Sequence, residues 1–184
     1  KRNIIEDLKK KMVFLVGPRQ VGKTWLARDV AKGYKKPLYL NYDSLEDRRI
    51  MQQIGWLPET DLLILDELHK MPKWKNYLKG VYDTRPNHLH ILVTGSARLE
   101  TYRQAGDSLA GRFFVHHLLP LSLKEIAGKK EKGDLDTLLN RGGFPEPFLA
   151  VSDADARRWR QGYIDSLLRE DILDFTDIDK YKSM

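Results

Sequence analysis

Cysteine is absent from this 184-residue chain. Disulfide bonds and zinc sites built on thiolates are therefore excluded, and nothing in the sequence points to an oxidising compartment. Long apolar runs are also absent. None approaches the roughly 20 residues that cross a bilayer, and residues 1–8 have no apolar segment of the signal-peptide kind. These absences predict a soluble, cytoplasmic protein without a membrane partner.

A dominant charge pattern is lacking as well. The formal net charge is +6 and the isoelectric point is near 9.4, which permits contact with nucleic acid but does not require it. The lysines are scattered over segments 9–11, 35–36, 73–75 and 129–130, and no nucleic-acid-binding motif with interleaved aromatic residues accompanies them. Most of them are interpreted as solvated surface, with a functional basic patch as the less favoured alternative.

The most informative segment is a phosphate-loop motif, G-x-x-x-x-G-K-[ST]. It reads Gly17-Pro18-Arg19-Gln20-Val21-Gly22-Lys23-Thr24. It follows the apolar run 12–16 and precedes a helical pattern that starts at Trp25, which is the context that the motif requires. The glycines let backbone N–H groups face the phosphates, Lys23 brings a cation to them, and Thr24 offers a hydroxyl to Mg²⁺. We expect residues 17–25 to contact a nucleoside triphosphate. The alternative is a glycine-rich turn that only resembles this loop.

A second segment, residues 61–67, is an apolar run that ends in Asp66 and Glu67. Alone it is weak evidence, because a buried strand that leads into an acidic helix start looks the same. Combined with the phosphate loop it indicates a Walker B segment. Asp66 would then hold Mg²⁺ through its water shell, and Glu67 would polarise the water that attacks the γ-phosphate.

A third apolar run, residues 90–93, leads into Thr94, Gly95 and Ser96. In a parallel sheet, ligands bind at the carboxyl ends of the strands, so we expect its tip to lie beside the Walker B segment. Thr94 or Ser96 would be able to hydrogen-bond the γ-phosphate or the attacking water. The alternative is that Thr-Gly-Ser forms only a turn.

Six motifs, of which the phosphate loop is the first, occur in a fixed order. The other five are Leu-Asp-Glu-Leu-His-Lys-Met-Pro-Lys-Trp (65–74), Thr-Gly-Ser-Ala-Arg (94–98), Ser-Leu-Ala-Gly-Arg (108–112), Leu-Pro-Leu-Ser (119–122) and Gly-Gly-Phe-Pro-Glu (142–146). From about residue 12 onward the chain resembles the AAA-type ATPase domain of the archaeal and bacterial predicted-ATPase superfamily. The resemblance implies Mg-dependent ATP binding and a C-terminal domain of uncharacterised function. One departure from the family is Trp25, which stands where threonine is common.

Strands alternate with helical patterns over residues 1–119, which predicts an α/β fold: a P-loop NTPase core with a parallel sheet flanked by helices. The expected strands are 12–16, 37–41, 61–66, 90–96 and 112–118, and the expected helices are 25–31, 45–53 and 72–82. From residue 120 the pattern is helical, with helices expected at 123–126, 135–140 and 153–173. We interpret residues 120–184 as a small helical lid subdomain, truncated before a further C-terminal domain.

Two further residues carry functional hypotheses. Pro145, in Gly142-Gly143-Phe144-Pro145, would form a wall against the adenine base, or the segment would only end a helix. Arg112 is the first candidate for the guanidinium that stabilises γ-phosphoryl transfer, supplied within the chain, by a neighbouring subunit or by a C-terminal domain. A structural ion pair is its alternative, and Arg98 and Arg19 are further candidates. The five histidines are more typical of strand-edge residues than of metal ligands.

The sequence thus predicts an ATPase that binds ATP and Mg²⁺ and hydrolyses ATP slowly, coupling nucleotide state to conformation. One alternative is a signalling or DNA-associated switch module with little intrinsic hydrolysis. A small-molecule kinase is less favoured because an acceptor-binding lid rich in arginine is not evident. A GTPase is disfavoured because no Asn-Lys-x-Asp motif occurs.

Overall fold

The computed structural model of the chain describes residues 2–95, 109–126 and 133–181. The chain divides into two compact units, Lys1–Leu119 and Pro120–Met184. Each unit is considered by itself. Within the described ranges, no helix combines the length and the apolar character needed to span a membrane.

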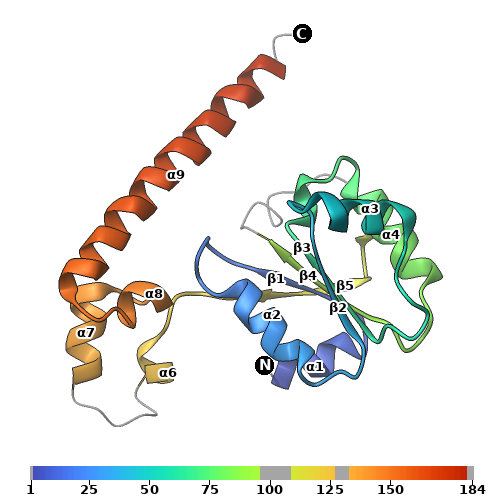
Figure 1. The fold of residues 1–184 in the computed structure, drawn as a ribbon, viewed down its shortest axis with the longest axis horizontal. Coiled ribbons are helices and arrows are strands. Elements are labelled where there is room, and N and C mark those ends of the chain that lie inside the picture. The colour runs from blue at the N-terminus through green and yellow to red at the C-terminus, as the bar shows by residue number, and fades with distance from the viewer. Residues whose placement is uncertain (1, 96–108, 127–132, 182–184) are drawn as a thin grey trace. The chain divides into compact units, whose positions relative to one another are not determined.

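The first unit contains a sheet of five parallel strands (Figure 1). The strands are β1 (Met12–Val16), β2 (Pro37–Asn41), β3 (Leu62–Asp66), β4 (His90–Gly95) and β5 (Phe113–His117). Their order across the sheet is β2-β3-β4-β1-β5. The strand β4 therefore separates β1, which leads into the phosphate loop, from β3, which carries the Walker B acids. The predicted fold class, a P-loop core with a parallel sheet flanked by helices, is confirmed.

Helices cover both faces of this sheet because the strands are apolar on both sides. On β1, Val13 and Leu15 pack with α1 (Arg2–Leu8) and α2 (Lys23–Ala31). The alternate residues, Met12 and Phe14, pack on the opposite face with α3 (Leu45–Gln53) and α4 (Trp74–Thr84). Figure 1 shows the first pair of helices on one side of the sheet and the second pair on the other. The result is two cores that share one rigid sheet.

The boundaries follow the sequence pattern closely, with a few differences. Helix α4 begins at Trp74 instead of residue 72, because a 3-10 turn (Leu68–Lys70) follows Glu67 and Lys73 adopts a left-handed conformation with φ 56°. Neither that turn nor α1 was predicted. Helix α1 has only seven residues and is stabilised by burial of Ile4 and Leu8 against the sheet.

The second unit is helical, as expected. It comprises α6 (Leu123–Ile126), α7 (Gly133–Arg141), α8 (Pro145–Phe148) and α9 (Asp153–Tyr181). The short α8 was not predicted, and α9 continues beyond the expected residue 173. The ring of Phe144 lies 5.3 Å from that of Trp159 and 5.0 Å from that of Tyr163, so an aromatic cluster fixes the start of α8 on α9. The Arg141 guanidinium donates to Asp153 Oδ1 at 2.7 Å.

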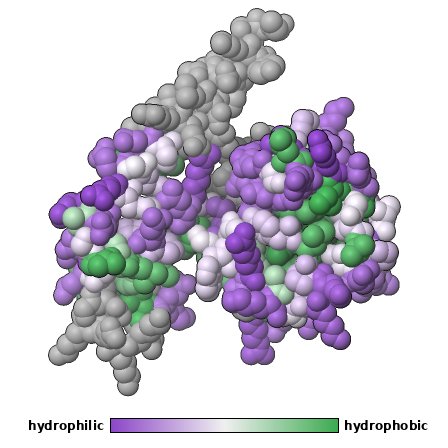
Figure 2. Space-filling view, viewed as in Figure 1, coloured by the Kyte–Doolittle hydropathy of each residue, from purple (hydrophilic) through white to green (hydrophobic). Residues whose placement is uncertain are grey.

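Hydrophilic residues cover much of the visible surface of the first unit, and apolar patches interrupt them (Figure 2). Large apolar side chains that are exposed on this unit include Leu45, Ile54 and Leu57, on α3 and in the segment after it. Isolated exposed apolar residues are normal on a soluble surface. Leu57 is different, because it lines a cavity beside the start of β2.

Candidate functional site

The phosphate loop forms the turn between β1 and α2, and its two glycines meet different requirements. At Gly17 an added Cβ would lie 2.1 Å from the carbonyl oxygen of Leu118, so any side chain would collide with the backbone after β5. Gly22 has φ 97°, a left-handed conformation that favours glycine, and it precedes the first turn of α2. The motif glycines therefore allow the tight approach of the chain and set the direction of α2.

Lys23 is the first residue of α2, and its side chain is buried to 8% exposure. Its Nζ donates to the carbonyl oxygens of Gly17 at 3.0 Å and Pro18 at 2.7 Å. Burial lowers the pKa of the Lys23 ammonium, while the charges of Glu67 and Asp66 raise it. The loop cation therefore lies within electrostatic reach of both Walker B acids.

The carboxylate of Asp66, at the end of β3, is the meeting point of four donors. Oδ2 accepts from Thr24 Oγ1 at 2.9 Å and from Tyr39 OH at 2.5 Å. Oδ1 accepts from Thr94 Oγ1 and from the Glu67 amide at 3.1 Å. Asp66 is only 4% exposed, and its partners lie on α2, β2 and β4. A carboxylate and a threonine hydroxyl are hard oxygen ligands of the kind that Mg²⁺ prefers, so the pair Asp66 and Thr24 fits the predicted metal-binding role.

Tyr39 was missed by the sequence analysis. It lies on β2, and its phenol reaches Asp66 because β2 pairs directly with β3, with Tyr39 opposite Ile64. Burial and the hydrogen bond to Asp66 raise the pKa of the Tyr39 hydroxyl. The sequence does show a tyrosine, with its polar hydroxyl, within an otherwise apolar strand. Its hydrogen-bond acceptor can be identified only once the pairing of β2 with β3 is known.

Glu67 has a left-handed backbone, with φ 55°, and its amide also donates to the carbonyl oxygen of Thr94 at 3.1 Å. Its Oε2 lies 3.6 Å from His69 Nε2 and 3.7 Å from Lys70 Nζ. Lys70 Nζ in turn donates to Asp43 Oδ2 at 2.6 Å. The turn after β3 thus directs the Glu67 carboxylate to a cluster of basic groups.

The other predicted site residues do not all lie beside Asp66. Thr94 lies opposite Asp66 in the sheet register and is fully buried, with its hydroxyl donated to that carboxylate. Trp25 is 71% exposed, and Pro145 begins α8 of the second unit. Ser96 and Arg98 lie outside the described residues.

Arg112 is not brought to the phosphate loop of its own chain. It precedes β5, whereas the loop follows the parallel strand β1. The five residues of the strand separate the two positions by about 16 Å at about 3.3 Å per residue. The Arg112 guanidinium donates to both oxygens of Asp83, at 2.8 and 3.2 Å. Within the chain it is therefore a partner of Asp83 on α4.

Comparison with known families agrees with this geometry. Residues 9–127 match the model of an AAA domain family, and residues 132–184 match a domain of unknown function, DUF8612. The first match covers more than half of the chain and includes the phosphate loop, both Walker B acids and β5. The chain belongs to the AAA domain family, with a domain of unknown function after the AAA domain.

Among curated proteins, the chain is similar to uncharacterized protein Rv2008c of Mycobacterium tuberculosis and uncharacterized protein Mb2031c of Mycobacterium bovis. Each is 31% identical over 162 residues. The alignment covers 88% of this chain and 36% of each relative. The chain thus spans about a third of the length of these relatives.

Among solved structures, the fold is similar to that of the RuvB Holliday junction branch migration motor of Thermotoga maritima. The TM-score is 0.55 at 22% identity, over 81% of this chain and 59% of the motor. Two variants of the same motor give TM-scores of 0.55 and 0.53 at 20% identity, over 81% of this chain and 58% of theirs. At this identity the likeness shows the P-loop fold alone.

Replacing Gly17 tests the close approach of the loop to Leu118. Gly17→Ala should destabilise the fold by about 1–3 kcal/mol and weaken nucleotide binding, because the backbone must shift to relieve the collision. Gly80→Ala is the matched control, since it lies within α4 with open space around it and should stabilise by about 0.5–1 kcal/mol. Thermal unfolding of both variants checks this. A Gly17→Ala protein as stable as the parent would contradict the described loop.

Proposed function

We propose that this chain binds Mg-ATP at the end of β1 and β3 and hydrolyses it slowly. The observation that supports this most is the convergence of Thr24, Thr94 and Tyr39 on the buried Asp66 carboxylate, next to the Lys23 cation. Such an arrangement suits a magnesium triphosphate, which needs oxygen ligands for the ion and a cation for the phosphates. A bound Mg²⁺ would neutralise charge that develops on the phosphate oxygens.

Each residue of the proposed site then has a defined role. The backbone N–H groups of residues 17–24 would face the phosphates, and Lys23 would exchange its contacts with the loop carbonyls for phosphate oxygens. Asp66 and Thr24 would hold the ion. Thr94 would fix the orientation of Asp66, since its hydroxyl already donates to that carboxylate.

Glu67 would accept the proton of the attacking water. Its carboxylate is close to His69 and Lys70, and these basic groups compete with a water molecule for its oxygens. This contact is consistent with slow turnover. It also supports the alternative function, a switch module for signalling or DNA-associated work in which bound nucleotide sets the conformation and hydrolysis is incidental. High turnover of the isolated chain would favour the enzyme, whereas strong stabilisation by ATP with negligible turnover would favour the switch.

The second unit would contribute to recognition of the base. We assign residues 120–184 to a lid, in which Pro145 would contact the base and favour adenine. A rigid ring is suited to this because α8 is anchored on α9 by the aromatic contacts of Phe144. A guanidinium for the γ-phosphate would come from Arg112 of a neighbouring copy or from a domain outside this chain.

Replacing Glu67 and replacing Asp66 should affect different steps, hydrolysis and Mg²⁺-dependent binding. Glu67→Gln keeps the shape of the side chain but removes the proton acceptor, so hydrolysis should fall by about 10² or more while binding persists. Asp66→Ala should instead change the Mg²⁺ dependence of binding. Phosphate release and calorimetric titration measure the two effects. If Glu67→Gln hydrolyses ATP at the rate of the parent, another group activates the water.

Arg112 is tested by mixing variants. If it acts on a neighbouring copy, turnover per chain should rise with protein concentration, and Arg112→Ala mixed with Glu67→Gln should recover activity that neither variant has alone. Asp83→Ala is the matched control, because it breaks the same ion pair and leaves the guanidinium in place. Equal loss of activity in Asp83→Ala and Arg112→Ala, without recovery on mixing, would assign Arg112 a structural role only.

A further inference from the structure

Lysines that are scattered in the sequence are gathered by the topology at one edge of the sheet. All five strands are parallel, so the segments that precede them meet at the same amino-terminal edge, opposite the phosphate loop. Lys9 and Lys10 precede β1, and Lys35 and Lys36 precede β2. All four are exposed. We refer to these four residues as the lysine row.

The ammonium groups of the lysine row form no ion pair within the part of the chain that the structure describes. Three carboxylates near this edge are already engaged. Asp61 accepts the backbone amides of Lys35 and Lys36 at 2.8 and 2.9 Å, Asp83 binds Arg112, and Asp7 lies 2.8 Å from His116.

The pKa of a half-buried histidine is affected by charged groups at the same edge. His90 begins β4, between the two halves of the lysine row. Its pKa is lowered first by burial and then by Arg85, with smaller contributions from Lys9 and His88, against a raising contribution from Asp61. Basic groups on two segments, residues 85–88 before β4 and Lys9 before β1, therefore act on one site.

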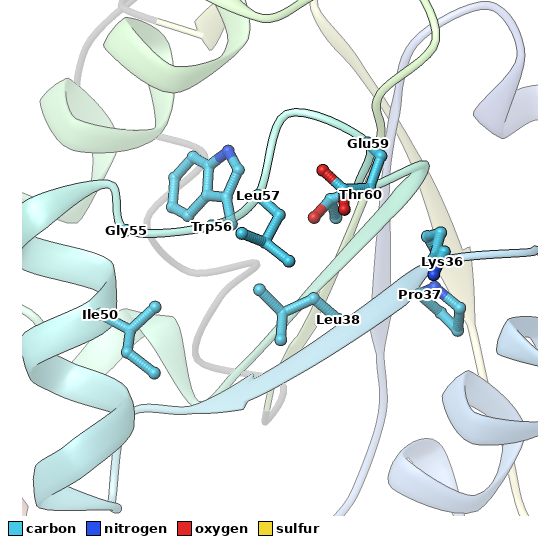
Figure 3. A pocket seen from close by; sticks show the side chains of 9 residues that line it. All are labelled: Lys36, Pro37, Leu38, Ile50, Gly55, Trp56, Leu57, Glu59 and Thr60. Atoms are coloured by element: carbon cyan, nitrogen blue, oxygen red, sulfur yellow. The ribbon is translucent and has the colours of Figure 1, made fainter.

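A cavity of about 220 Å³ lies at the same edge (Figure 3). It is open to solvent and is bordered by the start of β2, the end of α3 and the segment before β3. Apolar side chains form most of its lining, among them Leu38, Trp56 and Leu57, and Lys36 of the lysine row lies at its border. His88 contacts the segment before β3 through the Pro58 carbonyl, 2.9 Å from its Nε2.

The size and chemistry of the cavity suit one flat ring. Its volume is below the about 300–1,000 Å³ of pockets for drug-sized ligands. Trp56 offers an indole for stacking, and Glu59 and Thr60 bring side-chain oxygens to the wall, where they would accept hydrogen bonds from the edge of a base. Aromatic stacking beside a cationic track is how proteins hold single-stranded nucleic acid.

We propose that the amino-terminal edge of the sheet binds single-stranded nucleic acid, with its phosphates on the lysine row and one unpaired base in the cavity beside Trp56. From β2 to β1 the row crosses three strand spacings, about 14 Å at 4.8 Å each. Stacked nucleotides rise about 3.4 Å per residue of one strand, so the row spans about four nucleotides. A base held in a duplex is not free to enter the cavity, which selects a single strand.

This site is separate from the ATP site, because the strands place the two at opposite edges of the sheet. The proposal therefore does not depend on hydrolysis, and the failure of one leaves the other intact. Adding saturating Mg-ATP to the binding assay keeps the phosphate loop from competing for the oligonucleotide.

The test is fluorescence anisotropy with a labelled single strand of about 12 nucleotides, within the range of known site sizes, at several salt concentrations. One variant replaces Lys9, Lys10, Lys35 and Lys36 with glutamine. Its affinity at low salt should fall at least tenfold, and its slope of log K against log salt should flatten by about 2–3, since each lost contact with a single strand accounts for about 0.7.

The matched control replaces four other exposed basic residues with glutamine: Arg49, Lys73, Lys124 and Arg157. It has the same net charge as the first variant, and it should keep the slope of the parent. Trp56→Ala should weaken binding at least fivefold without changing the slope. Leu45→Ala, at an exposed apolar residue of α3 that does not line the cavity, should have no effect.

Several results would overturn the proposal. These are equal losses in the two glutamine variants, no salt-dependent binding by the parent, or affinity for a duplex of the same sequence or for anionic lipid vesicles that matches the affinity for the single strand. Because all four lysines are exposed, their replacement leaves the cores intact, and thermal unfolding of the variant verifies this. The two glutamine variants therefore test the proposal even if Trp56→Ala disturbs local packing.

Discussion

The burial of the Asp66 carboxylate is the constraint on which the site depends. A buried carboxylate needs hydrogen-bond donors, and here they come from the helix after the phosphate loop, from an edge strand and from the strand between β1 and β3. Each donor is in range only if its own segment is correctly placed. The hydrogen bonds of one side chain thus link the phosphate loop, Walker B and two further strands.

The order of the strands explains why this linkage is possible. Strand β4 lies between β1 and β3. Thr94 therefore lies beside Asp66, and the phosphate loop follows β1 on the other side of β4. Apolar residues on both faces of the sheet hold these strands between two pairs of helices. The proposed nucleotide site lies at the carboxyl ends of the strands, and the lysine row and the adjoining cavity lie at the opposite edge.

The sequence was sufficient for features that depend on local patterns. Strands β1 and β2 and helix α3 have the predicted bounds because their residue types specify the conformation over a few positions. Features that depend on pairing between distant segments could not be read in this way. Tyr39 reaches Asp66 across 27 positions of sequence, and the lysine row exists only because parallel strands bring separate turns to one edge. The placement of Arg112 beside Asp83 also depends on the register of β5 against β1.

The most direct test of this account is calorimetric titration of Mg-ATP into the parent and into Lys23→Ala. Lys23 is the only lysine of the loop, and its ammonium is held at the loop by two backbone carbonyls. Lys32→Ala is the control, because that lysine is exposed and lies 3.4 Å from Asp29 in a surface ion pair. The account predicts binding at least tenfold weaker in Lys23→Ala, a difference of about 1.4 kcal/mol, and parent-like binding in Lys32→Ala. Unchanged affinity in Lys23→Ala would contradict it.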